Sequence, residues 1–493
     1  MQFKDRYQLY IDGSWRDAED GALVETKNPA TGEVLSKIAD ASKKDVDEAV
    51  AAARRAFCGP WRETTKEERA ELLLKIADII DANTEMLATI ETMDNGKPIR
   101  ETMAVDVPLS ADHFRYFAGV LRSEEDQASI LDGKFLNLIM KEPIGVVAQI
   151  VPWNFPFLMA AWKLAPALAA GDTIVLKPSS STSLSVLALV ELIGDLLPKG
   201  VLNVVTGRGS KSGEFLQHHP DIDKIAFTGS TEVGREIGIS AAEQLIPATL
   251  ELGGKSANII FDDADMEQAL DGAQLGILFN QGQVCCAGSR LFVQEGIYDS
   301  FVKKLVEKFE GIRVGNPLDK ETVMGSQIDE RQLQKILSYV DIAKENGATI
   351  LTGGKRLEEG ELAKGAFMAP TIITDQQNDD RVCQEEIFGP VVVIQKFASE
   401  DEVVRLANDS DYGLGGGVYT KNLDRALSVA RRIRTGRMWV NTYNQIPAGA
   451  PFGGYKDSGI GRETHKMILN SYCQTKNILI DLTGKPSGFY DVK

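Results

Sequence analysis

The sequence predicts an α/β protein that has a doubly wound, mostly parallel sheet and a second α/β domain after it. Three observations carry this prediction. Short apolar strands alternate with amphipathic helices from residue 145 onwards, as repeated βαβ units do. Turns rich in glycine and serine follow several of these strands, where parallel sheets bind their ligands. With 493 residues, the chain is long enough to form two or three domains.

The first 125 residues are predicted to form short strands and then long helices. Strands are expected at Tyr7–Asp12 and Val34–Ala39, each next to a turn that contains glycine. A helix is expected to begin at Ser42, because the Ser-x-x-Asp pattern there is typical of a helix start. Two long amphipathic helices, Thr65–Asn95 and Arg100–Arg122, are predicted to follow.

Residues 126–142 differ from their surroundings, because a strand-like piece at Phe135–Met140 has no helix directly after it. We expect a projecting hairpin, which could offer an exposed edge to a partner. An ordinary surface hairpin fits the pattern equally well. The tail contains another isolated strand-like piece, Gln474–Leu482, which could pair with the hairpin in the same or another subunit.

Strands and helices alternate regularly through residues 146–252. Repeated crossovers of this kind make the strands parallel, so polar residues just after each strand are candidates for a binding site. The predicted strands are Val146–Val151, Thr173–Leu176, Val201–Val205, Lys224–Phe227 and Ala248–Leu252, and the predicted helices are Leu158–Ala170, Leu184–Leu196, Ser210–Gln217 and Thr231–Ala241.

A second alternation begins at Ser256 and indicates a second α/β domain. The glycine-rich stretch Gly413–Gly417 is interpreted as a turn. Strands are predicted at Ser256–Phe261, Leu291–Gln294 and Val391–Lys396, and helices at Met266–Phe279, Tyr298–Phe309, Gln332–Asn346, Glu402–Asn408 and Asn422–Ile433.

The composition narrows the possible partners and location. A formal net charge of −17 disfavours nucleic acid, because affinity for a phosphate backbone comes from lysine and arginine. No stretch approaches the roughly 18 uncharged apolar residues of a membrane helix, since Lys163 interrupts the best candidate, Leu158–Ala170. The first ten residues lack the apolar stretch of a signal peptide. A cytoplasmic protein without membrane attachment is therefore expected.

The five cysteines include one adjacent pair, Cys285 and Cys286, which lies between glycines and small polar residues. The scattered set argues against a secreted disulfide framework, and it forms no zinc-ligand spacing with the four histidines, so no metal is expected. Buried structural thiols usually lie in apolar runs, and adjacent cysteines are poorly placed to bond each other. One of the pair is therefore a candidate thiolate nucleophile; two buried free thiols are the alternative.

Two turns that follow predicted strands are candidates for binding a phosphate or a ribose. The segment Phe227–Gly234 ends a strand and begins a helix, so it can offer free backbone amides to an anion. The segment Lys177–Ser180 ends another strand of the same sheet, and its lysine could reach a phosphate or ribose. A helix cap and a surface lysine are the ordinary alternatives. The segment Gly207–Gly213 lacks the glycine spacing of a dinucleotide fingerprint, and Gly254–Ser256 lacks the earlier glycine of a P-loop.

Several motifs then occur together in one order. They are Pro152–Pro156 (PWNFP), Gly229–Gly234, Glu251–Ser256 (ELGGKS), Gln281–Cys286, Glu385–Pro390 (EEIFGP) and Pro451–Gly454 (PFGG). In this combination the chain resembles the aldehyde dehydrogenase superfamily over nearly its whole length. Three further segments look most like those of bacterial acetaldehyde dehydrogenases: Asp94–Thr102, Asp112–Phe117 and Gly461–Met467.

The resemblance implies a Rossmann-like NAD(P)-binding domain, an α/β catalytic domain and a small β element for oligomerisation. The cofactor domain is expected at residues 1–125 and 143–253, and the catalytic domain at residues 254–457. The oligomerisation element is expected at residues 126–142 and 470–493, since a projecting hairpin and a C-terminal strand form it in the family. A homodimer or homotetramer is therefore expected.

The resemblance also implies that an aldehyde is oxidised with NAD or NADP to the acid, through a thiohemiacetal and a thioester on Cys285. Asn154 and the backbone N–H of Cys285 match the donors to the oxyanion. Glu251 matches the general base that activates the hydrolytic water. Lys163 and Glu463 match residues that relay a proton from that base.

For the cofactor, the resemblance assigns Lys177 to the adenosine ribose, Ser230 to the pyrophosphate and Glu386 to the nicotinamide ribose. NAD-selective members often carry a glutamate three residues after this lysine, where it repels a 2′-phosphate. The position holds Ser180, so NADP is expected to be accepted. The expected cofactor-binding residues are Ile150, Val151, Pro152, Trp153, Lys177, Ser180, Gly229, Ser230, Gly234, Leu252, Glu386 and Phe388.

The expected substrate channel is apolar and bulky, which suits a short aliphatic aldehyde such as acetaldehyde better than a charged semialdehyde. Betaine aldehyde and semialdehydes are the alternatives within the family. A cofactor-free, cysteine-dependent acyltransferase or thioesterase is the alternative of another class, and it leaves the Gly229–Gly234 turn and Glu386 without a role. The expected channel residues are Leu109, Phe155, Leu158, Trp162, Val284 and Phe452.

Overall fold

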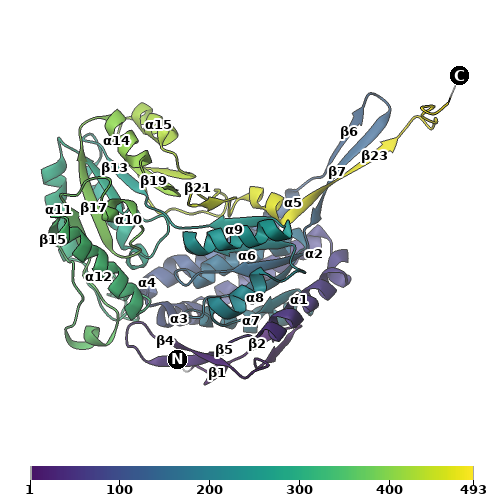
Figure 1. The fold of residues 1–493 in the computed structure, drawn as a ribbon, viewed down its shortest axis with the longest axis horizontal. Helices are drawn as coiled ribbons and strands as arrows, with labels where there is room; N and C mark the ends of the chain where they lie inside the picture. The colour runs from purple at the N-terminus through teal and green to yellow at the C-terminus, as the bar shows by residue number, and fades with distance from the viewer. Residues whose placement is uncertain (1–2, 492–493) are drawn as a thin grey trace.

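Two large sheets of mostly parallel strands form the centre of the computed structural model, which describes residues 3–491 (Figure 1). A third sheet projects away from both, and two small sheets lie elsewhere. The fold class predicted from the sequence is confirmed. The first two residues of the predicted cofactor domain and the last two of the predicted oligomerisation element lie outside the described residues.

Eight strands form the sheet of the first domain. Its five central strands are parallel and match the five strands predicted between residues 146 and 252, with small shifts at their ends. Antiparallel strands complete both edges. The order is β22 (Gly459–Ile460), β12 (Ala248–Glu251), β11 (Lys224–Thr228), β8 (Val146–Ile150), β9 (Thr173–Lys177), β10 (Leu202–Val204), β2 (Leu9–Ile11) and β3 (Ser14–Arg16).

The direction in which the parallel strands are added reverses beside β8. The chain runs from β8 to β9 and β10 on one side, and then returns to β11 and β12 on the other. Ligands of open α/β sheets bind outside the carboxyl ends of the strands at such a reversal. The turns that follow β8 and β11, Val151–Asn154 and Gly229–Ser230, therefore meet at one crevice.

Helices cover both faces of this sheet, because apolar side chains at helical spacing pack against the alternating side chains of the strands. The segment predicted as one helix over Thr65–Asn95 is two helices, because the chain leaves helical geometry at Asn83. One face carries α2 (Lys66–Ala82), α3 (Thr84–Asn95), α5 (Val107–Ser123), α6 (Pro156–Ala170) and α7 (Leu184–Ile193), and the other carries α1 (Lys43–Phe57), α8 (Glu214–Gln217) and α9 (Thr231–Gln244).

The helix predicted over Arg100–Arg122 is also interrupted. A short helix, α4 (Ile99–Glu101), leads into a π-helical turn at Thr102–Asp106 before α5 begins. Single π-helical turns are often found at functional sites, because the extra residue re-aims the side chains around it. Here the turn lies directly before the helix that carries Leu109.

Seven strands form the sheet of the second domain, and all but the edge strand β15 run parallel. Four of them, β15, β16, β19 and β20, are absent from the sequence prediction. The order is β15 (Thr349–Thr352), β16 (Thr371–Thr374), β17 (Val391–Phe397), β14 (Arg290–Gln294), β13 (Ala257–Ile260), β19 (Gly415–Tyr419) and β20 (Arg437–Val440).

The interpretation of Gly413–Gly417 as a turn is wrong, because most of this stretch is the buried strand β19. A Cβ atom on Gly415 would lie 3.0 Å from the ring of Trp439, and one on Gly417 would lie 2.7 Å from Tyr443. Glycine is usually depleted in strands, but it is used where another group approaches closely. Here the glycines leave room for two aromatic rings behind the cysteine pair.

The helices of the second domain lie on both sides of its sheet, as the amphipathic patterns predict. Within residues 3–491, no helix combines the length and the apolar character needed to cross a membrane. The helices are α10 (Met266–Leu278), α11 (Tyr298–Glu310), α12 (Glu330–Glu345), α13 (Arg381–Gln384), α14 (Glu400–Asn408) and α15 (Leu423–Arg432).

The hairpin and the C-terminal tail form one three-stranded sheet that projects from the body of the molecule (Figure 1). The tail strand pairs with the second strand of the hairpin along its whole length within the same chain, which is one of the two pairings that the sequence allows. Several apolar side chains on this sheet are exposed, among them Ile130, Leu131 and Leu479. The strands are β6 (Gln127–Leu131), β7 (Phe135–Pro143) and β23 (Cys473–Asp481).

Candidate active site

A cavity of about 720 Å³ lies where the carboxyl edge of the first sheet faces the cysteine segment of the second domain. It brings together most residues that the sequence assigns to a site. These are Asn154, Glu251 and Cys285 of the catalytic set; Pro152, Trp153, Gly229, Ser230, Leu252, Glu386 and Phe388 of the cofactor set; and Leu109, Phe155, Leu158, Trp162, Val284 and Phe452 of the substrate set.

The remaining predicted residues do not line this cavity. Lys163 and Glu463 are buried and form an ion pair, with Nζ 2.6 Å from Oε1. Gly234 packs against Leu252, whose side chain leaves no room for a Cβ atom on that glycine. The others lie at or just beyond the ends of β8 and β9; they are Ile150, Val151, Lys177 and Ser180.

A sharp bend precedes the cysteine pair. Asn280, Gln281 and Gly282 are successive residues in left-handed backbone conformation, which is unfavourable for the two that are not glycine. Buried hydrogen bonds hold the bend: the Asn280 side chain donates to the carbonyl of Asn154 at 2.7 Å, and its backbone N–H donates to Glu101 Oε2 at 3.0 Å. The strain is therefore balanced by bonds that fix the cysteines relative to Asn154.

The two cysteines have different environments, and no disulfide joins them. Cys285 is partly exposed, whereas Cys286 is 1% exposed with its Sγ 3.7 Å from Asn444 Oδ1. The adjacent Cys286 thiol, together with burial, holds the pKa of Cys285 well above its usual value. The carboxylates of Glu386 and Glu251 act in the same direction. The Cys285 thiol is therefore neutral near pH 7 and needs a base to become a thiolate.

Asn154 is oriented by the same segment. Its Nδ2 donates to the carbonyl of Gln283 at 2.9 Å, and its side chain borders the cavity. One N–H of the amide is used in this bond, so the second can point toward a reacting oxygen. Among the described residues, no acceptor takes the backbone N–H of Cys285. Two donors are thus available beside the sulfur, and one such donor contributes roughly 3 kcal/mol to stabilising an oxyanion.

Glu251 ends β12 and faces the cavity, although its side chain is almost fully buried. Within residues 3–491, neither carboxylate oxygen accepts a hydrogen bond. Burial, and then the nearby Glu463, raise the pKa of Glu251 well above its usual value. A carboxylate with a raised pKa is a stronger base, which suits the activation of water. A Cβ atom on Gly453 would lie 2.7 Å from Glu251 Oε1, so glycine is required there.

The other half of the cavity can hold a dinucleotide. Ser230 caps the start of helix α9, so the free N–H groups and the positive dipole of this helix face the turn Gly229–Ser230. Glu386 accepts a hydrogen bond from Gly254 N at 2.9 Å, and a side chain on Gly253 would collide with it. Lys177 is buried, which lowers its pKa to about 8, and its Nζ donates to the adjacent carbonyl of Pro178 at 3.0 Å.

Two aromatic rings border this half of the cavity. Trp153 and Phe388 meet edge to face, with ring centres 5.3 Å apart. Phe388 has a φ of +60°, which is rare for a bulky residue and marks a position under constraint. Free amides at a helix start, a fixed carboxylate for a ribose and a flat aromatic surface fit NAD or NADP.

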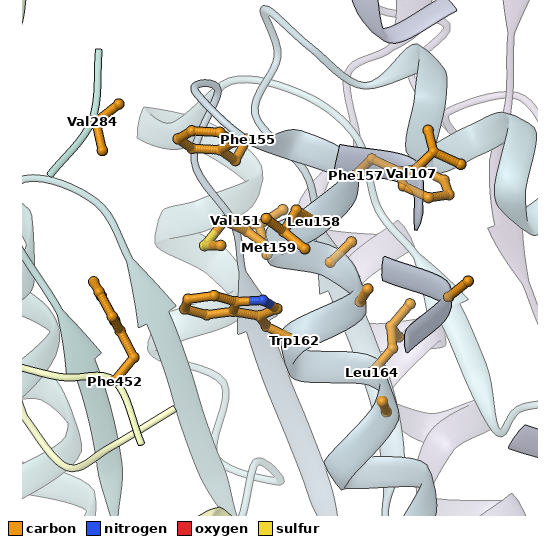
Figure 2. Close-up of a cluster of buried hydrophobic side chains, with 14 of the residues drawn as sticks. Val107, Val151, Phe155, Phe157, Leu158, Met159, Trp162, Leu164, Val284 and Phe452 are labelled. Carbon is orange, nitrogen blue, oxygen red and sulfur yellow. The ribbon is translucent and has the colours of Figure 1, made fainter. Parts of the chain in front are cut away.

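The opposite end of the cavity is lined by apolar side chains, and several of them are drawn in Figure 2. Phe155, directly before α6, and Trp162, on α6, lie on the side of the helix that faces Val284 and Phe452. The rings of Trp162 and Phe452 meet at 5.4 Å in an edge-to-face arrangement. His113 stacks on Trp162 from α5 at 5.5 Å, and burial lowers the pKa of this histidine to about 4, so it adds no charge.

Sequence reasoning missed several residues that line the cavity. Ala104, Val105, Pro108 and Asp112 line it together with Leu109, at the spacing of one helix face. Since Leu109 was identified, helical periodicity could have found the others. A second missed group lies on α12, and a third follows the missed strand β20; they are Gln332, Lys335, Asn444, Gln445, Ile446 and Pro447.

Comparisons with known proteins agree with this geometry. The model of the aldehyde dehydrogenase family matches residues 15–478. Aldehyde dehydrogenase B of Escherichia coli (strain K12) is 51% identical over 497 residues, which cover 99% of this chain and 96% of that protein.

Solved structures give the same result. An aldehyde dehydrogenase of Bacillus cereus, solved as its NAD+ complex, has a TM-score of 0.95 at 44% identity and covers 97% of each chain. Betaine aldehyde dehydrogenase of Staphylococcus aureus, also in complex with NAD+, has a TM-score of 0.96 at 42% identity, covering 99% of this chain and 97% of that one. The chain therefore belongs to the aldehyde dehydrogenase family and is an NAD(P)-dependent oxidoreductase.

Proposed function

We propose that the chain oxidises a short, uncharged aldehyde such as acetaldehyde to the carboxylic acid, through a thiohemiacetal and a thioester on Cys285. One observation carries this proposal: a single cavity contains a partly exposed thiol, two oxyanion donors and a buried carboxylate, and its aldehyde end is apolar. An aldehyde has no leaving group until a nucleophile makes its carbon tetrahedral, and covalent catalysis provides that adduct.

The side chains support a two-stage reaction. Glu251 takes the thiol proton, and the Cys285 sulfur then attacks the aldehyde carbon. Asn154 and the Cys285 N–H stabilise the oxyanion. Oxidation of this adduct to the thioester needs a hydride acceptor, which a bound NAD or NADP would supply. After Glu251 has released the thiol proton to solvent, it takes a proton from water and the resulting hydroxide attacks the thioester. The sulfur leaves and takes the proton of the carboxylic acid, which releases the carboxylate and restores the thiol.

The cofactor contacts follow the same reasoning. Ser230 and the first amides of α9 would hold the pyrophosphate, and Glu386 would accept hydrogen bonds from the nicotinamide ribose. Lys177 would donate to the adenosine ribose. Trp153 and Phe388 would limit the space beside the nicotinamide.

The charges around the cavity support an uncharged substrate. Among the described residues that line it, Lys335 is the single cation, and it lies on α12 with Gln332 rather than on the aldehyde side. Asp112 is exposed on the α5 side of the lining. A semialdehyde would place its carboxylate near that of Asp112 with no cation beside it, and the two negative charges would repel each other. Betaine aldehyde is the second candidate, because Asp112 and the rings of Trp162 and Phe452 could face a quaternary ammonium group.

A panel of aldehydes tests the substrate proposal. We expect kcat/KM for acetaldehyde and propionaldehyde to exceed that for a carboxylate-bearing semialdehyde by roughly tenfold or more, because no cation balances the added charge. Asp112→Asn is expected to narrow this ratio while leaving acetaldehyde oxidation within about twofold. A kcat/KM for betaine aldehyde far above that for acetaldehyde would identify a cationic substrate instead.

Cofactor choice gives a second prediction. Ser180 lies three residues after Lys177 and carries no charge that would repel a 2′-phosphate, so the wild type should turn over NADP. Ser180→Glu is expected to lower kcat/KM for NADP roughly tenfold to hundredfold and to leave NAD nearly unaffected. Ser180→Gln, of similar size but neutral, is the matched control. Undetectable turnover of NADP by the wild type would contradict the proposal.

We also propose that the chain forms a homo-oligomer, either a dimer or a tetramer, through the projecting sheet. Exposed apolar side chains on β6 and β23 support this, because exposed apolar surface of this kind often marks an interface. A cytoplasmic location is proposed as well. Its support is that the five cysteines are free, as is usual in a reducing compartment.

A further inference from the structure

A line of buried polar side chains runs beneath one face of the cofactor sheet, starting from Glu251. The strand register places Thr249 and Gln149 on either side of Ala226. Lys224 lies two residues earlier on the same strand, so its side chain shares that face. Its Nζ donates to Thr249 Oγ1 at 3.2 Å. All four polar side chains are less than 5% exposed, so they form a buried polar stripe.

The covering elements add further polar groups to this stripe. Lys163, on α6, pairs with Glu463, and its backbone carbonyl accepts a hydrogen bond from Gln149 Nε2 at 2.7 Å. Tyr472, in the segment that leads into β23, is fully buried, with its ring centre 5.1 Å from Lys224 Nζ. The stripe therefore continues beyond the Lys163–Glu463 pair toward the amino ends of the strands.

The stripe ends at Asp172, in the turn between α6 and β9. Its Oδ1 accepts a hydrogen bond from Gly145 N at 3.0 Å. The backbone N–H of the following residue, Val146, donates to Asp223 Oδ2 at 2.7 Å. The Asp223 side chain is 31% exposed and therefore reaches solvent. The charge of Asp172 also acts on Arg69 of α2, where it opposes the lowering of the arginine pKa by burial. Polar groups thus connect the catalytic edge of the sheet to solvent at its opposite edge.

Oxygen atoms without hydrogen-bond donors recur along this stripe. Buried oxygens normally have a partner, and internal water supplies one where the protein does not. Chains of such oxygens and side chains can pass a proton from one to the next. Within residues 3–491, the buried oxygens that accept no hydrogen bond include both of Glu251, Glu463 Oε2, Gln149 Oε1, the Tyr472 hydroxyl and Asp172 Oδ2.

The electrostatics agree with proton exchange along the stripe. Burial lowers the pKa of Lys224 to about 8, with Glu463, Lys163 and Asp172 also acting on it, so it can both give and take a proton near neutral pH. Burial, followed by Glu463 and Asp172, raises the pKa of Tyr472. The same carboxylates therefore act on both side chains, which places these groups close together.

We propose that Lys224, Tyr472 and Asp172 carry the proton taken up by the general base through the interior of the cofactor domain to its opposite edge. This rests on the proposed role of Glu251. Thioester formation turns aldehyde, thiol and NAD(P)+ into thioester, NAD(P)H and one proton. Hydrolysis turns thioester and water into carboxylate, thiol and a second proton. That second proton passes from Glu251 to Glu463 and onward, and Glu251 is ready for the next turnover.

A single-turnover experiment tests the path, with the full-length enzyme in excess over acetaldehyde in weak buffer. A pH-indicator dye records proton release while NAD(P)H absorbance records oxidation. In Tyr472→Phe, NAD(P)H formation is expected to match the wild type, and one of the two protons to appear at least ~10-fold later. The steady-state kcat should fall by a similar factor, with little change in kcat/KM. A merely structural role would not delay one proton selectively.

Tyr419→Phe is the matched control, because it removes another buried hydroxyl that has no partner among the described residues, but from the second sheet. If Tyr472→Phe yields too little folded protein, Lys224→Gln is measured in the same way. Proton release as fast as in Tyr419→Phe overturns the path. A different variant tests the role of Glu251 as the base. If Glu251 is not the base, Glu251→Gln will hydrolyse the thioester at the wild-type rate, and this result does not depend on Tyr472→Phe.

Discussion

Replacing Cys285 with alanine should lower aldehyde oxidation to below ~0.1% of the wild-type rate. Without the sulfur no adduct forms, and the oxyanion donors beside it have no tetrahedral carbon to act on. The cofactor half of the cavity is untouched, so NAD(P)+ should still bind with near wild-type affinity. NAD(P)H absorbance measures the first effect and cofactor titration the second.

Cys286→Ala is the control that separates the two thiols. Cys286 is almost fully buried, with its sulfur near Asn444, so its loss should cost about 1 kcal/mol of folding stability and less than tenfold in activity. Equal losses in both variants, or an active Cys285→Ala enzyme, would contradict the assignment. Alkylation by iodoacetamide gives an independent check: it should modify Cys285 slowly near neutral pH and faster as pH rises, since the pKa of this thiol is raised.

The sequence predicted the five parallel strands of the first large sheet well because these strands are mostly apolar and buried. Alternating strands and helices between residues 146 and 252 leave a periodic pattern that local reasoning can read. The carboxyl ends of these parallel strands lie at one edge of the sheet, and the strand order reverses beside β8. The residues directly after the strands could therefore be assigned to a site from their positions along the chain alone.

The second domain was predicted less completely, for physical reasons. β19 is built from glycines because the rings of Trp439 and Tyr443 approach it, and that requirement lies more than 20 residues away in sequence. The bend at Asn280–Gly282 depends on hydrogen bonds from distant segments, among them Glu101. Neither feature leaves a local pattern. They can be found only after the chain has folded.

The polar stripe under the cofactor sheet was hidden for a related reason. Lys224 and Gln149 lie in strands that otherwise read as apolar, and Tyr472 is more than 200 residues away from both. Local reasoning treats each as an isolated polar residue. The strand register and the covering segment bring them together, and only then do they suggest proton transfer.

Replacing Glu251 with glutamine should stop the reaction between its two chemical stages. Glutamine has nearly the same size, so it fits the space beside Gly453, but it cannot accept a proton from water. If another group or hydroxide deprotonates the thiol, we expect a burst of about one NAD(P)H per subunit, after which turnover falls by a factor on the order of 10²–10⁴. Intact mass measurement should then show the acyl group retained on the enzyme.

The pH dependence of the wild type gives the same assignment an independent test. Burial and Glu463 raise the pKa of Glu251, and only the ionised carboxylate can act as the base. Steady-state turnover should therefore be low at acidic pH and rise as pH passes upward through this pKa, provided hydrolysis limits the rate. In Glu251→Gln this rising limb should disappear from the hydrolysis step. A variant that shows no acyl-enzyme and keeps the wild-type pH profile would place the base elsewhere in the cavity.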